Sequence, residues 1–270
     1  MSIMQAFWLG LVQGLTEFLP ISSSGHLDLI QKLFGLSTEN FMTLDVLLHV
    51  GTLLAVVAVY WKRLWKMILD LVKSPLKSEI WLLVIATIPA VIAALLFDFD
   101  DKVFSTQFLG FAFLITTLIL WLSDLISGVS FETKEVKWSN ALVMGVMQAL
   151  AILPGISRSG STISGGISTG LSRKRSADFA FLMSIPAILG AIVLQIKDNG
   201  TEIFDGTLIT QMGGALPLLA GVITSAVFGF LAIKFMLAIV RRVRLTWFGV
   251  YTGVLGIAIL LDQYVFHYFF

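Results

Sequence analysis

Long apolar stretches without charged residues alternate with short polar segments along the whole chain. Six of these stretches approach the roughly 20 apolar residues that a helix needs to cross a bilayer. They cover residues 46–61, 80–97, 103–123, 179–196, 206–233 and 245–261. The pattern therefore predicts six membrane-spanning helices.

Two further apolar segments, residues 1–33 and 138–172, are interrupted midway by proline, glycine and serine. The interruptions are Pro-Ile-Ser-Ser-Ser-Gly at 20–25 and Pro-Gly-Ile-Ser-Arg-Ser-Gly at 154–160. Broken backbone at membrane depth is tolerated only where it is buried in protein or lines a polar cavity. We therefore expect two re-entrant helix–loop–helix hairpins, each of which enters and leaves the membrane on the same side.

Composition restricts the class of protein. Hydrophobic residues make up 57% of the chain and charged residues 13%, whereas a soluble domain has roughly 45–50% and about 25%. These fractions exclude a soluble enzyme, a nucleic-acid-binding protein and a disordered chain. There is no cysteine, so disulfides and thiolate metal sites are excluded, and no signal peptide is evident. We expect an all-α polytopic membrane protein with a single integral membrane domain over residues 1–270.

Basic residues gather in the loops on one side of this predicted topology. They are Lys62, Arg63, Lys66, Lys73, Lys77, Lys134, Lys137, Arg173, Lys174, Arg175, Lys234, Arg241, Arg242 and Arg244. The opposite loops contain only Lys102 and Lys197 beside several acidic residues. Because cytoplasmic loops are enriched in lysine and arginine, both termini are expected outside the cytoplasm. With eight full crossings, the basic residues would be distributed over both sides of the membrane. Their actual distribution therefore favours six spans and two hairpins.

The two hairpins resemble each other in sequence. Residues 10–25 and 145–160 share the order of a glutamine, a proline and a Ser-x-Ser-Gly run, with one gap in each copy. Three predicted spans follow each hairpin, and because three is odd the second copy is inverted. This predicts an inverted-topology repeat of about 1–127 and 138–264, with the functional site where the broken helices meet. The alternative is that similar packing motifs arose independently.

Charged residues are scarce within the hairpins. Glu17 is the only one in residues 1–27, and Arg158 is the only one in residues 138–172. An ionisable side chain at membrane depth is costly and is a functional-site hypothesis by default. If the hairpins meet, these two residues are joined by polar side chains from both breaks: Ser22, Ser23, Ser24, His26, Ser157, Ser159, Ser161 and Thr162.

The polar residue types in this set suit phosphate chemistry. A helix that begins after Pro154 directs free N–H groups into the site and favours an anion there. Arg158 adds a planar fork that matches phosphate oxygens. The candidate phosphate-binding residues are Ser22, Ser24, Ser157, Arg158, Ser159 and Thr162.

The first hairpin offers a nucleophile and oxygen ligands. Ser23 and His26 are three residues apart, and a hydroxyl beside an imidazole is a minimal activated nucleophile. Glu17 and Gln13, one helical turn apart, offer oxygen ligands to a hard divalent cation, which would offset charge as a leaving group departs. Together these features favour phosphoryl transfer or hydrolysis at the membrane.

Other interpretations remain open at this stage. Serine clusters in membrane helices commonly serve helix packing, as in a passive structural subunit. Glu17 as a proton relay with Arg158 as its counter-ion would suit a secondary transporter or a lipid flippase. His49 and Asp45, four residues apart at the start of a span, are more typical of a structural contact.

Residues 13–26 and 154–162 resemble the two signatures of a known family. They read Gln-Gly-Leu-Thr-Glu-Phe-Leu-Pro-Ile-Ser-Ser-Ser-Gly-His and Pro-Gly-Ile-Ser-Arg-Ser-Gly-Ser-Thr. Both are similar to motifs of the undecaprenyl pyrophosphate phosphatases, the bacitracin-resistance family, and the similarity extends through the whole chain. Gln13 stands where that signature has glutamate or glutamine, so metal binding is expected to depend more on Glu17.

The resemblance implies hydrolysis of undecaprenyl pyrophosphate to undecaprenyl phosphate, the carrier lipid recycled in peptidoglycan synthesis. It implies catalytic roles for Glu17, Ser23, His26 and Arg158, with either Ser23 or His26 as the attacking group. It also implies a divalent cation, Mg²⁺ or Ca²⁺, and a site that opens to the outer face of the bacterial cytoplasmic membrane. The expected partners are this lipid and membrane lipid, with homodimer formation left open.

Overall fold

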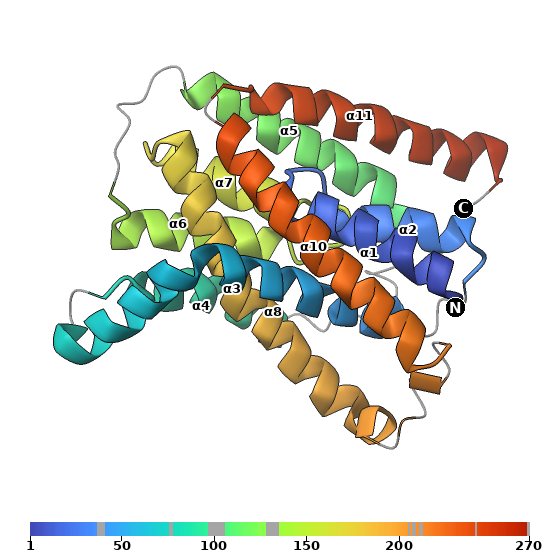
Figure 1. Cartoon of the computed structure of the whole chain (residues 1–270). Helices are drawn as coiled ribbons and strands as arrows, with labels where there is room; N and C mark the ends of the chain where they lie inside the picture. Colours follow the sequence, from blue (N-terminus) through green and yellow to red (C-terminus); the bar gives the residue numbers. More distant parts are fainter. Residues whose placement is uncertain are drawn as a thin grey trace.

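A computed structural model describes residues 1–36, 41–75, 78–96, 106–127, 135–204, 206, 209–210, 213–240 and 242–268. The elements of this part of the chain are all helices, which confirms the expected all-α class (Figure 1). They are α1 (Ile3–Phe18), α2 (Ser23–Leu33), α3 (Phe41–Lys73), α4 (Ile80–Leu96), α5 (Leu109–Ser127), α6 (Trp138–Leu150), α7 (Arg158–Ser168), α8 (Arg173–Phe204), α10 (Ala215–Ile239) and α11 (Leu245–Leu261), with a 3₁₀ turn at Thr106–Phe108 and a π-helical turn at Asp262–Phe266.

Five helical segments of the described residues are long and apolar enough to cross a membrane. They are Leu44–Lys73, Leu109–Ile126, Arg173–Lys197, Ala215–Ile239 and Leu245–Phe266. α4 is equally apolar but has 17 residues, which gives a length of about 25 Å at 1.5 Å per residue. Each predicted span thus overlaps one helix, and the chain is a multi-pass membrane protein. Of the basic loop residues, Lys77, Lys102, Lys134 and Arg241 lie outside the described residues, as do the acidic residues Asp98, Asp100, Asp101 and Asp205 of the opposite loops.

Each of the two apolar segments with a central interruption forms two short helices. α1 ends at Phe18 before α2 begins at Ser23, and α6 ends at Leu150 before α7 begins at Arg158. A serine caps each second helix: Ser22 Oγ accepts from the N–H of Gly25, and Ser157 Oγ accepts from that of Gly160. α2 and α7 have 11 residues each, which is about half of the length that a membrane crossing needs.

Glycine allows two pairs of helices to pack backbone against backbone. A Cβ atom on Gly10 of α1 would lie 2.3 Å from the carbonyl oxygen of Gly221 in α10. A Cβ atom on Gly145 of α6 would lie 2.3 Å from the carbonyl oxygen of Ala86 in α4. Small residues at such crossings are the usual means of close helix association in membranes. Figure 1 shows α10 lying across α1.

The core is built around the second hairpin and α8. Every residue from Ser159 to Ile167 of α7 is buried, and Phe181 of α8 packs edge-on against Phe18 with ring centroids 5.3 Å apart. In α2, by contrast, only Gly25, Leu27 and Gln31 are buried. The two hairpins therefore differ in how completely the remaining helices cover them.

An ionic cluster joins α3, the start of α4 and α8. Glu79 accepts from Arg63 at 2.8 Å, and its other carboxylate oxygen pairs with Arg175. Partial burial raises the pKa of Glu79, but the two guanidinium groups outweigh this effect and hold the pKa below its ordinary value. Glu79 is thus ionised at neutral pH and links the three helices.

Candidate active site

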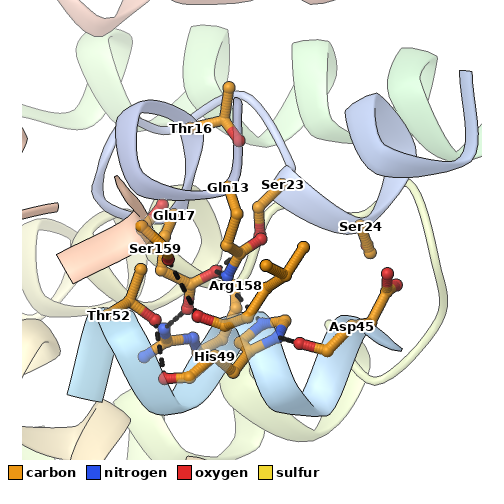
Figure 2. Close-up of polar contacts among 12 residues, drawn as sticks. Gln13, Thr16, Glu17, Ser23, Ser24, Asp45, His49, Thr52, Arg158 and Ser159 are labelled. Atoms are coloured by element: carbon orange, nitrogen blue, oxygen red, sulfur yellow. Dashed lines mark hydrogen bonds and ion pairs between the residues drawn. The ribbon is translucent and has the colours of Figure 1, made fainter. Parts of the chain in front are cut away.

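The carboxylate of Glu17, in the last turn of α1, is the centre of a polar cluster (Figure 2). Its Oε1 atom pairs with the guanidinium group of Arg158. Its Oε2 atom accepts from Ser23 Oγ at 2.5 Å and from Gln13 Nε2 at 3.1 Å, and lies 3.2 Å from His49 Nε2. Because Glu17 is only 5% exposed, these contacts replace the water that would otherwise solvate its charge.

Four helices contribute to this cluster, and both breaks lie beside it. Gln13 and Glu17 are one turn apart on α1, while Ser23 and Arg158 are the first residues of α2 and α7. A direct hydrogen bond also joins the two hairpins, from Ser159 Oγ to the carbonyl oxygen of Leu19 at 2.7 Å. The expected meeting of Glu17 and Arg158 at the breaks is therefore confirmed.

Ser22 has a left-handed backbone, with a φ of 68°. Such a conformation in a residue other than glycine costs of order 1–3 kcal/mol and is concentrated at functional sites. Ser22 directly precedes Ser23, at the point where the chain turns from α1 into α2. The turn thereby allows the Ser23 hydroxyl to reach back to Glu17, six residues earlier.

His49 of α3 is held at both of its ring nitrogens. Nδ1 lies 2.6 Å from the carbonyl oxygen of Asp45, and Nε2 faces Glu17. A carbonyl oxygen can only accept, so Nδ1 carries a proton. The Nε2 contact then requires a second proton, shared between His49 and Glu17. The structural contact expected between His49 and Asp45 is present through the backbone, whereas the role of His49 at the site was missed.

His26 lies away from the Ser23 hydroxyl. Its Nδ1 is 2.7 Å from the carbonyl oxygen of Ser22, and its Nε2 is 2.7 Å from the hydroxyl of Tyr251 in α11. The imidazole also stacks on the Tyr251 ring, with centroids 5.6 Å apart. Since both ring nitrogens are engaged elsewhere, the expected pairing of His26 with Ser23 is wrong, and the partner of Ser23 is Glu17.

Three of the candidate hydroxyl groups of the second hairpin form hydrogen bonds within the protein, whereas Ser161 Oγ is buried and has no hydrogen-bond partner in the described part of the chain. Ser157 Oγ caps α7, Ser159 Oγ donates to Leu19, and Thr162 Oγ1 lies 2.8 Å from the carbonyl oxygen of Arg158. In the structure these side chains organise the start of α7. The Arg158 side chain itself retains 17% exposure, so it is the phosphate-binding candidate of this hairpin with solvent access.

The remaining serines of the first break do not join the cluster. The hydroxyl oxygens of Ser22 and Ser24 lie 3.4 Å apart. Figure 2 shows the Ser24 side chain to one side of Glu17 and its partners. Of the three consecutive serines, Ser23 is therefore the one that contacts the buried carboxylate.

The chain was compared with known proteins. Residues 6–258 match the family described as bacitracin resistance protein BacA. This chain belongs to that family. It is 43% identical over 265 residues to the undecaprenyl-diphosphatase of Carboxydothermus hydrogenoformans, which covers 97% of this chain and 98% of the relative. It is 41% identical over 266 residues to the undecaprenyl-diphosphatase of Halothermothrix orenii, with the same coverage.

A third relative is the undecaprenyl-diphosphatase of Methanosphaera stadtmanae, 37% identical over 281 residues, covering 97% of this chain and 98% of the relative. The part of the chain that matches the BacA family includes every residue of the Glu17 cluster. The site that the structure assembles is thus part of the domain that the family shares.

The Glu17 cluster contains side-chain oxygens of the kind that bind a hard divalent cation. Among the described residues, no group of three His, Cys, Asp or Glu side chains forms a metal cage. The Glu17 carboxylate and the Ser23 hydroxyl nevertheless lie in contact, and the amide group of Gln13 contacts Glu17 through its Nε2 atom. Gln13 Oε1 is buried and has no hydrogen-bond partner within the described chain, so this oxygen can still accept a ligand. The donor set fits a cation such as Mg²⁺ or Ca²⁺.

Proposed function

We propose that this member of the BacA family hydrolyses undecaprenyl diphosphate to undecaprenyl phosphate and inorganic phosphate. It thereby recycles the carrier lipid for peptidoglycan synthesis and confers bacitracin resistance. The observation that supports this most directly is the Ser23 hydroxyl, 2.5 Å from the carboxylate of Glu17 and beside Arg158. In a secondary transporter the Glu17–Arg158 ion pair could take part in transport. Transport does not need a nucleophilic hydroxyl group that is hydrogen-bonded to a proton acceptor.

In the first step, Ser23 Oγ attacks the terminal phosphorus of the diphosphate. The Oγ–P bond forms, the bond from that phosphorus to the bridging oxygen breaks, and undecaprenyl phosphate leaves. The hydroxyl proton passes to Glu17 Oε2 along the existing 2.5 Å hydrogen bond, so Glu17 acts as the general base.

In the second step, water attacks the phosphoserine. The Oγ–P bond breaks, and Ser23 Oγ recovers the proton that Glu17 holds. Inorganic phosphate leaves with the oxygen and protons of the water, which returns the site to its starting state. Both ring nitrogens of His26 are engaged by Ser22 and Tyr251, which supports Ser23 over His26 as the attacking group.

The guanidinium group of Arg158 stabilises the negative charge that develops on the phosphate oxygens during the reaction. Its guanidinium has five N–H donors in a fixed fork, so it can contact phosphate oxygens while one donor remains on Glu17. A planar fork also orients the terminal phosphate relative to Ser23. His49 and Gln13 act through Glu17: they hold Oε2 in place and are positioning residues.

A divalent cation would be held by oxygen atoms of Glu17 and Gln13. When bound, it supplies positive charge that offsets the charge of the diphosphate and of the leaving group. The unpartnered Gln13 Oε1 atom supports this assignment.

The proposed topology has six membrane spans, two re-entrant hairpins, and inverted repeats of about 1–127 and 138–264. Its support is the matched packing of Gly10 against α10 and of Gly145 against α4, together with the sorting of basic loops. The protein then lies in the bacterial cytoplasmic membrane with both termini outside and the site opening outward. Because the chain has no cysteine, single cysteines at Gly200 and Ser74 test this: Gly200 should be labelled from outside and Ser74 should not.

The experiment for the activity is phosphate release by the purified protein from undecaprenyl diphosphate, with and without a chelator. Wild type should release phosphate, chelator should suppress release, and Ser23→Ala should be inactive. Thr16→Val is the matched control, because Thr16 hydrogen-bonds only to the carbonyl oxygen of Val12 and points away from Glu17 in Figure 2. Absence of phosphate release from folded wild-type protein would overturn the proposal.

A further inference from the structure

A polar stripe on α2 faces the start of α3, outside the Glu17 cluster. Ser24, Asp28 and Gln31 are spaced by four and three residues, which places them on one face of the helix. Gln31 Nε2 donates a hydrogen bond to Asp45 Oδ1 at 3.0 Å. This bond fixes the direction of the stripe, which is turned toward Asp45 of α3.

Two carboxylates at this stripe lie close enough to repel each other. They belong to Asp28 and Asp45, and both residues are partly buried. Lys32, one turn after Asp28, is attracted to Asp28 and to Asp262 alike, so its single charge does not balance the pair. His49 attracts Asp45 but is also engaged by the catalytic carboxylate. Negative charge between α2 and α3 is therefore left for a further cation to balance.

Gln31 supplies an observation that is independent of these charges. The residue is 0% exposed, and its Oε1 atom is buried without a hydrogen-bond partner in the described part of the chain. Its Nε2 atom holds the Asp45 carboxylate, so the unpartnered oxygen belongs to an amide group that is turned to the acidic pair. A buried carbonyl oxygen without a partner is unfavourable, and a bound cation would satisfy it.

The possible ligands at this place are all oxygen atoms. Besides the two carboxylates and the Gln31 amide, the stripe carries the hydroxyl of Ser24, 3.4 Å from that of Ser22. Figure 2 shows the Asp45 side chain directed away from Glu17, toward the part of α2 that carries Ser24. Ca²⁺ takes roughly six to eight oxygen ligands from carboxylates, amide carbonyls and water in a flexible geometry, whereas Mg²⁺ demands a near-ideal octahedron. Two carboxylates with neutral oxygens on a partly exposed site therefore fit Ca²⁺ better.

We propose that Asp28 and Asp45, together with the amide oxygen of Gln31, form a second cation site that binds Ca²⁺. It shares no residue with the cation site proposed at Glu17 and Gln13. Two carboxylates balance the charge of one divalent ion, and the exposed part of the site leaves room for water to complete the coordination.

The position of the site gives the ion a role beside the active site. Asp45 is the second residue of the span Leu44–Lys73, at its outer end in the proposed topology, so Ca²⁺ reaches it from outside. Ser24 directly follows Ser23, the proposed nucleophile. Unbalanced carboxylates here would repel an arriving diphosphate, and the bound ion removes that repulsion.

The test measures calcium binding in the absence of the Glu17 carboxylate. Equilibrium dialysis with Ca²⁺ is applied to the purified full-length protein with Glu17→Gln, which should bind one Ca²⁺ per chain with a Kd of about 0.1–1 mM, the range of open extracellular sites. Adding Asp28→Asn and Asp45→Asn should weaken binding more than tenfold. Adding Asp70→Asn instead should leave Kd within twofold, because Asp70 is on the same helix as Asp45 but near its other end.

Two results of this experiment would overturn the inference. Absence of saturable binding by the Glu17→Gln protein up to about 10 mM Ca²⁺, tenfold above that range, would show that the carboxyl groups are neutralised by protons instead. An equal Kd with and without Asp28→Asn and Asp45→Asn would place the ion elsewhere.

Anomalous scattering from wild-type crystals grown with Ca²⁺ gives a second measurement that does not depend on a variant folding. A peak should lie between Asp28 and Asp45, beside the amide oxygen of Gln31. Absence of a peak there, including a peak confined to Glu17 and Gln13, would contradict the assignment.

Discussion

His49 Nε2 lies 3.2 Å from Glu17 Oε2, the carboxylate oxygen that also accepts the hydrogen bond of Ser23. The first long span, α3, therefore reaches the proposed nucleophile only through Glu17. The other side of the imidazole is fixed by the carbonyl oxygen of Asp45 at 2.6 Å. This arrangement makes the orientation of the general base depend on a helix outside both hairpins.

Replacing His49 separates this positioning role from simple packing. His49→Leu should lower kcat about 10- to 100-fold, the usual effect of losing an outer-shell partner, with little change in KM. His49→Gln keeps a side-chain N–H donor and should recover most of the lost kcat. Steady-state kinetics on undecaprenyl diphosphate provides the measurement. Equal kcat values for wild type and His49→Leu would remove His49 from the mechanism.

Arg158→Lys should lose most activity although the charge is kept. An ammonium group cannot reproduce the planar contact with phosphate oxygens, and removal of one such group typically costs on the order of 10²-fold in kcat. Arg173→Lys is the control, because Arg173 pairs with Asp124 away from the Glu17 cluster. Near-normal turnover by a folded Arg158→Lys variant would exclude a phosphate-clamping role.

Gly145→Leu should destabilise the protein, because its Cβ atom would lie 2.3 Å from the Ala86 carbonyl oxygen. Overpacking of this kind typically costs about 1–3 kcal/mol, seen as a lower unfolding temperature in detergent. Gly190→Ala is the matched control, since no atom lies within 4 Å of a Cβ built at this helical glycine. An unchanged unfolding temperature for Gly145→Leu would show that α4 and α6 do not approach this closely.

The Glu79 cluster predicts a pH-dependent contribution to stability. The folded-state pKa of Glu79 is below its ordinary value of 4.5 because Arg63 and Arg175 outweigh the effect of burial. A carboxyl group with a lowered pKa stabilises the fold above its unfolded pKa, and this contribution is lost as the pH falls through the folded pKa. Glu79→Gln should lower the unfolding temperature at pH 7, and the difference from wild type should shrink below about pH 4.5. A difference independent of pH would contradict the ionic assignment.

The helices and the central ion pair could be predicted from the sequence. The spans follow from apolar length, and the meeting of Glu17 with Arg158 follows from two isolated charges beside matched helix breaks. Both are properties of local composition, which a single sequence displays directly.

Which of the two histidines, His26 or His49, contacts the pair of Glu17 and Ser23 could not be predicted in the same way. Ser23 and His26 have a suitable spacing, but the positive φ of Ser22 sets where α2 begins, and the partner of His26 is Tyr251, 225 residues away. His49 reaches Glu17 through the packing of α3, which no local pattern encodes. The one available signal was that His49 is itself an ionisable residue within a predicted span.

In the proposed mechanism Ser23, activated by Glu17, attacks the terminal phosphorus. Rapid quenching of the purified protein with terminally labelled undecaprenyl diphosphate, followed by peptide mass spectrometry, tests it most directly. We expect a phosphoryl group on Ser23 in wild type, with neither label nor phosphate release in Ser23→Ala. Label on His26, or phosphate release by Ser23→Ala at the wild-type rate, would contradict it.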